Sequence, residues 1–72
     1  MSNAPYQIRT TYLDGTITRD MINNEFDNPH MTLMNYIARH PVFFADVAKI
    51  DVLNLDNQVL DSHEFAPVRR AA

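Results

Sequence analysis

The chain has 72 residues, of which 46% are hydrophobic, and it contains no cysteine. This length allows one domain with a marginal core, and the missing cysteine excludes disulfides and thiolate metal sites. Nine acidic against six basic side chains give a net charge of −3, too acidic for a nucleic-acid binder that neutralises phosphates. No apolar run approaches membrane-spanning length and no signal pattern opens the chain, so we expect a cytoplasmic protein without membrane association.

Residues 1–5 are expected to be a disordered N-terminus or the remnant of a purification tag. The next stretch alternates apolar and polar residues on both sides of Asp14-Gly15, a pair typical of two-residue hairpin turns. Such a turn pairs Tyr12 with Ile17 and Ile8 with Met21. This register predicts one apolar face, made of Tyr6, Ile8, Tyr12, Ile17 and Met21.

One helix is predicted after this hairpin. Asn28 is a favourable N-cap, Pro29 suits the first helical position, and Pro41 prevents continuation beyond His40. Residues 42–44 are apolar and are expected to form the corner that leads into the third strand. The stripe predicted to face the sheet consists of Leu33, Met34, Ile37 and Ala38.

The second hairpin repeats the pattern of the first, because residues 50–60 match residues 8–18 with Asp56-Asn57 at the turn. The register from such a turn pairs Lys49 with Glu64 and Leu53 with Leu60 on one face. Asparagine takes the left-handed conformation of such a turn less readily than glycine, so a longer, bulged loop is the alternative at this turn. The other face is predicted to carry Ala48, Ile50, Val52, Val59 and Phe65.

These elements predict an α+β fold: ββαββ, a four-stranded antiparallel sheet from two hairpins with one helix packed on one face. Residues 6–65 are expected to form the single domain. Residues 66–72 have no apolar period and are expected to be a flexible C-terminal tail.

The three histidines do not indicate a metal site. His30 and His40 fall at opposite ends of the predicted helix, about 15 Å apart by helical rise, and His63 lies near the end of the last strand. None has the spacing that pre-organises a metal ion. We therefore predict neither a metal ion nor a cofactor.

Acid–base and nucleophilic chemistry have as little support. Asp14 and Asp56 occupy turn tips, where aspartate is favoured by local backbone hydrogen bonds, and Asp51 and Asp61 are predicted on opposite faces. Ser62 stands alone, and the single glycine of the chain cannot build a phosphate cradle. We predict no catalytic residue and no enzymatic activity.

A protein-binding surface is the remaining candidate. Leu53 and Leu60 are predicted to face each other on the sheet side opposite the helix, with Val47 nearby, and exposed apolar residues gathered on one face usually bind a partner. The sheet edges offer a second mode, addition of a strand from another chain. Association with another protein or with a copy of itself is expected, and a homodimer would bury more surface for so small a domain.

In its size, lack of cysteine and mild acidity, the chain is similar to small accessory proteins encoded by phages and mobile elements, although it shares no motif with them. That resemblance implies a regulatory module that binds and inhibits a host protein. The alternative is a small enzyme or ligand-binding protein whose site is completed across a homodimer by His30, Tyr36, His40 or His63. A nucleic-acid-associated regulator that uses Arg69 and Arg70 of the tail is the third hypothesis.

Overall fold

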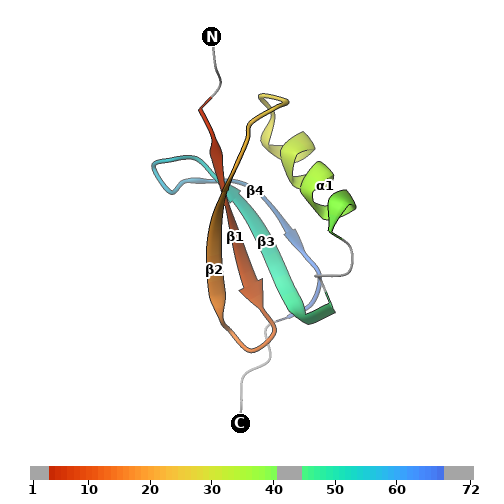
Figure 1. Ribbon diagram of the computed structural model, residues 1–72. Helices are drawn as coiled ribbons and strands as arrows, with labels where there is room; N and C mark the ends of the chain where they lie inside the picture. The colour runs from red at the N-terminus through yellow and green to blue at the C-terminus, as the bar shows by residue number, and fades with distance from the viewer. Residues whose placement is uncertain (1–3, 41–44, 68–72) are drawn as a thin grey trace.

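The computed structural model describes residues 4–40 and 45–67. In this part the chain forms β1 (Tyr6–Tyr12), β2 (Ile17–Ile22), α1 (Pro29–Arg39), β3 (Val47–Leu53) and β4 (Val59–Glu64) (Figure 1). The strands make one antiparallel sheet in the order β2-β1-β3-β4, and α1 contacts β3 and β4. The predicted ββαββ fold is confirmed. The expectations for residues 1–3, 42–44 and 68–72 lie outside the described residues.

The first hairpin has a three-residue loop, so the predicted two-residue turn is wrong. The Tyr12 N–H donates to the Thr16 carbonyl (2.8 Å), and the Gly15 N–H donates to the Tyr12 carbonyl (3.0 Å). Gly15 has a φ of 92°, which a residue without a Cβ adopts at little cost. The Asp14 carboxylate accepts the Thr16 N–H at 2.8 Å and closes the loop.

The extra loop residue shifts the whole strand pairing by one position. Ile8 pairs with Asp20 instead of Met21, and Ile17 pairs with Thr11 instead of Tyr12. Because opposed residues share a face, Ile17 and Met21 lie on the side away from the helix, where they are 57% and 58% exposed. Their predicted place on the core face is therefore wrong.

The second hairpin repeats the first in backbone detail. The Asn54 N–H donates to the Gln58 carbonyl (3.0 Å), and the Asn57 N–H donates to the Asn54 carbonyl (3.1 Å). Asn57, with a φ of 66°, takes the left-handed position that Gly15 has in the first loop. The sequence repeat thus encodes two three-residue loops of one type, and in the second hairpin this is the longer loop that asparagine at the turn left open.

The predicted pairing of β3 with β4 is confirmed only over part of its length. Lys49 pairs with Glu64 as predicted and Val52 pairs with Asp61, but Leu53 pairs with Val59 instead of Leu60. Leu60 is the additional residue at this bulge. Val59, predicted on the core face, is the partner of Leu53 and is 50% exposed.

The helix is capped as the sequence predicts. The Asn28 side chain accepts the Met31 N–H at 3.0 Å, Pro29 opens the helix, and His40 is the C-cap. Its buried positions, however, are Thr32 and Leu33, and Ala38, predicted to face the sheet, is exposed. Met34 and Ile37 pack against the core together with Leu33, so three of the four predicted positions are confirmed and only Ala38 is not.

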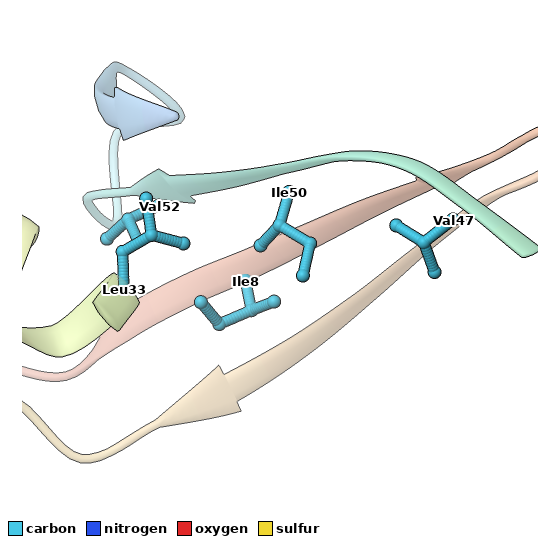
Figure 2. Close-up of a cluster of buried hydrophobic side chains, with 5 residues drawn as sticks. All are labelled: Ile8, Leu33, Val47, Ile50 and Val52. Carbon is cyan, nitrogen blue, oxygen red and sulfur yellow. The ribbon is translucent and has the colours of Figure 1, made fainter. Parts of the chain in front are cut away.

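The core is small and lies between α1 and the central strands. Figure 2 shows Leu33 of α1 gathered with side chains of β1 and β3. The buried cluster consists of Ile8, Leu33, Val47, Ile50 and Val52. Each of these side chains contributes roughly 1.5–3 kcal/mol by burial, so few of them can be lost from a domain of this size.

Candidate binding surfaces

The three predicted partner-binding residues do not form one exposed patch. Val47 is 3% exposed and belongs to the core, Leu53 is fully buried, and Leu60 is 39% exposed. The bulge between β1 and β3 inserts Ala48 and pairs Val47 with Tyr12, which turns Val47 to the helix side. Leu60 alone of the three offers surface to a partner in this fold, and its role in binding stays a prediction.

Leu53 is buried on the helix-free face next to the β3–β4 loop, which bends over the sheet. The Gln7 Nε2 donates to the Asn54 carbonyl (2.9 Å) and to the Asn57 Oδ1 (3.0 Å). Arg19 Nη1 of β2 donates to the same Asn57 oxygen at 3.0 Å. In Figure 1 this loop projects past β1 on the side away from α1. Side-chain contacts with β1 and β2 therefore hold the loop over this end of the helix-free face.

An ion pair occupies the middle of the helix-free face. Arg9 directs Nε and Nη2 to Oδ2 of Asp51, both at 3.0 Å, and Lys49 Nζ lies 3.9 Å from the same oxygen. The Asp51 side chain is only 3% exposed. Since Arg9 and Asp51 are cross-strand partners, the pair fastens β1 to β3. A buried carboxylate held in this way has a structural role.

The sheet has two edges, and β2 forms the first. All its residues are exposed except Ile22, which is half-buried. In an antiparallel pair of strands, every second residue directs its backbone N–H and C=O groups toward the neighbouring strand. Because Thr16 accepts a hydrogen bond from Tyr12 of β1, Thr18 and Asp20 also direct their backbone groups toward β1. The backbone groups of Ile17, Arg19 and Met21 therefore point away from the sheet, ready to pair with another strand.

The second edge is β4, in which every residue except the half-buried Asp61 is exposed. The Phe65 N–H donates to the Ala48 carbonyl at 2.7 Å. By alternation, His63 and Asp61 turn their backbone groups toward β3, and Ser62 and Glu64 turn theirs outward. Both edges of the described sheet thus present backbone donors and acceptors.

A histidine–carboxylate pair joins α1 to β4. His30 Nδ1 lies 2.9 Å from Asp61 Oδ2, and the two side chains are 69% and 28% exposed. From the sequence, His30 is predicted at the helix start and Asp61 on the face opposite Asp51, and no pattern predicts that the two meet. The missing information was the position of the helix, which lies against β4 at the edge of the sheet. No local pattern in the sequence reports that position.

The other two histidines contact aromatic rings. His40 lies against Tyr36 with ring centroids 5.0 Å apart, and His63 lies edge-on to Phe65 at 4.7 Å. Burial raises the pKa of the Tyr36 hydroxyl, and the nearby Asp20 and Tyr12 raise it further. No group of three histidine, aspartate and glutamate side chains gathers as a metal site among residues 4–40 and 45–67.

A shallow hollow of about 180 Å³ lies between α1 and the segment that joins it to β2. The buried Thr32 Oγ1, on its helix wall, has no hydrogen-bond partner within the described part of the chain. Its lining is mixed polar and apolar and comprises Ile22, Asn23, Glu25, Phe26, Thr32, Asn35, Tyr36, Arg39 and His40. The hollow is large enough for a few water molecules or a small chemical group. Its volume is smaller than that of a usual ligand pocket.

The chain matches no protein-family model, no curated protein and no solved structure. Within the described ranges, no helix has the length and apolar character needed to cross a membrane.

Proposed function

We propose that this protein is a non-enzymatic binding module that accepts an extended segment of another protein as an additional strand beside β2. The observation that carries the proposal is the open edge: β2 is exposed along its length, and Ile17, Arg19 and Met21 direct their backbone groups outward. An added strand gains main-chain hydrogen bonds, and alternate side chains give specificity. Ile17 and Met21, both more than half exposed, would contact the added strand.

The charges of β2 favour a different protein over a second copy at this edge. When two copies pair antiparallel around a twofold axis, residues directly opposite each other lie on the same face of the sheet. Along β2 the odd-numbered residues share one face and the even-numbered residues share the other, so the numbers of two opposed residues must add to an even sum. The two registers with the longest overlap set Arg19 opposite Arg19, or Asp20 opposite Asp20, in the two copies. Like charges directly opposed are destabilising.

The same pattern defines the segment that fits. On an antiparallel strand, apolar residues four positions apart would oppose Met21 and Ile17. An acidic residue between them would oppose Arg19, and a basic residue would oppose Asp20 on the other face. Read in its own direction, the segment is apolar, basic, acidic, any residue, apolar.

The experiment is a titration with a peptide containing Val-Lys-Glu-Thr-Val, followed by NMR of the labelled protein. We expect shifts concentrated at the amides of Ile17, Arg19 and Met21, and about ten-fold weaker binding of the exchanged peptide Val-Glu-Lys-Thr-Val. Arg19→Glu should lower this preference, whereas Arg39→Glu, the same charge change on α1, should leave it intact. Equal binding of both peptides, or shifts centred elsewhere, would refute the proposal.

We infer further that the module regulates its partner by occupying a segment that the partner needs. The phage accessory proteins that the chain resembles act by binding and inhibiting host proteins, and strand addition suits such a role because it masks a segment completely. An inhibitor of this kind would lose its effect with Arg19→Glu and keep it with Arg39→Glu.

A further inference from the structure

We propose that β4 pairs with β4 of a second copy, so that the partner's His63 joins the His30–Asp61 pair of each chain. The supporting features are the open edge of β4, the alternation of its backbone groups and the positions of Asp61 and His63 on one face. This assembly uses the sheet edge opposite β2 and is independent of strand addition there. It would produce one continuous sheet of two copies with both helices on the same face.

The positions of Asp61 and His63 in β4 select one register. Two antiparallel registers around a twofold axis give the longest overlap of residues 59–64. In one of them Asp61 opposes the partner's Asp61, which is unfavourable. In the other, Ser62 lies on the axis opposite the partner's Ser62, and Asp61 opposes the partner's His63. By symmetry this favourable pair occurs twice.

The backbone alternation fits the same register. Ser62 and Glu64 direct their amides and carbonyls away from β3, so Ser62 and the partner's Ser62 can exchange two hydrogen bonds at the axis. Asp61 and the partner's His63 then form a non-hydrogen-bonded pair, the kind in which side chains approach most closely, with Cα atoms about 4.5 Å apart. The β2 edge has no register of comparable overlap that avoids like charges.

Each half of the dimer would then contain a cluster from two chains. Asp61 already lies 2.9 Å from His30 on the helix side of the sheet. His63 pairs with Ile50, a core residue, and therefore projects from this same side. Asp61 would thus lie between its own His30 and the partner's His63, with Phe65, 37% exposed, packed against each His63 ring.

Because the chain has no cysteine, a single introduced thiol tests the register directly. Ser62→Cys should form a disulfide-linked dimer under mild oxidation at micromolar concentration, since Cα atoms about 5.5 Å apart permit this bond. Thr18→Cys, an exposed position on the β2 edge, is the matched control and should remain largely monomeric. Equal cross-linking of the two variants would overturn the proposal.

A charge variant tests the composite cluster. His63→Asp places an aspartate opposite the partner's Asp61 at both symmetry-related positions. The dimer dissociation constant, measured by sedimentation equilibrium, should therefore rise roughly thirty-fold. The control His63→Lys should preserve the dimer. Circular dichroism checks that both variants fold. An unchanged dissociation constant for His63→Asp, or a wild-type protein that is monomeric at millimolar concentration, would refute the inference. Peptide binding at β2 should be unaffected by His63→Asp, so the two proposals fail separately.

Discussion

The buried Arg9–Asp51 pair provides the sharpest test of how this small sheet is held together. We expect Arg9→Met to destabilise the protein severely, because methionine keeps much of the aliphatic bulk and removes both nitrogens that contact Asp51. The carboxylate, which is 3% exposed in the native fold, would keep only Lys49, at 3.9 Å, as a charged neighbour. A buried charge without its partner is among the few single changes that cost several kcal/mol.

The magnitude follows from the burial of the two partners. Breaking a buried ion pair costs about 3–5 kcal/mol, and the lower end applies here because the Arg9 side chain is 25% exposed and Lys49 remains nearby. A domain of this size has roughly 3–5 kcal/mol of total stability. Arg9→Met should therefore be largely unfolded, or show a urea midpoint lower by about 3 M for a slope near 1 kcal/mol per molar.

Urea titrations monitored by circular dichroism provide the assay, and two further variants complete it. Arg9→Met combined with Asp51→Val replaces the pair by apolar side chains and should recover much of the lost stability. Arg19→Met removes the exposed arginine that opposes Arg9 on β2, and it should cost less than about 1 kcal/mol. If Arg9→Met loses less than this control, or the double variant recovers nothing, the Asp51 carboxylate does not depend on Arg9.

Three smaller predictions concern the caps and loops. Asn28→Ala removes the N-cap acceptor of α1 and should cost about 1 kcal/mol in urea unfolding. Gly15→Ala should also cost about 1 kcal/mol, from backbone strain alone, because no atom lies within 4 Å of the added Cβ; Gly15→Asn should cost less. The hydrogen bond from the Thr16 N–H lowers the pKa of Asp14 below its ordinary value of 3.8. The ionised Asp14 carboxylate therefore stabilises the fold at pH values above 3.8, and this stabilisation is lost as the pH falls through the lowered pKa. Asp14→Asn should accordingly make the free energy of unfolding less dependent on pH in the acidic range.

Local patterns in the sequence were sufficient for the elements and the helix cap. Asn28, Pro29 and the two turn pairs each act through neighbouring backbone groups, and short-range physics decides them. The predicted length of the first loop was wrong. Asp14-Gly15 suits a two-residue turn, but the loop has three residues with Gly15 at the third position, so Tyr12 pairs with Thr16. A single residue of difference in the loop moved Ile17 and Met21 to the opposite face.

The candidate surfaces depended on long-range geometry that no local pattern carries. Burial of Val47 comes from a bulge against β1, and burial of Leu53 accompanies a loop held by Gln7 and Arg19, both distant in sequence. The His30–Asp61 contact likewise requires the helix to lie over β4. Bulges and helix placement are tertiary outcomes, which explains why the elements were predictable and the exposed surface was not.

The two edges of this sheet differ in the order of their polar side chains, and this difference is why we propose a different kind of partner for each. In β2, Arg19 and Asp20 are adjacent and lie on opposite faces, so a twofold axis through the middle of the strand must oppose like charges on one face or the other. In β4, Asp61 and His63 are two positions apart on one face, so an axis at Ser62 opposes unlike groups twice. We therefore propose that the β2 edge resists self-association and binds another protein, whereas the β4 edge binds a copy of itself. A dimer joined at β4 would carry a β2 edge at each end, and a ligand with two matching segments would then bind more tightly than a single segment through effective concentration alone.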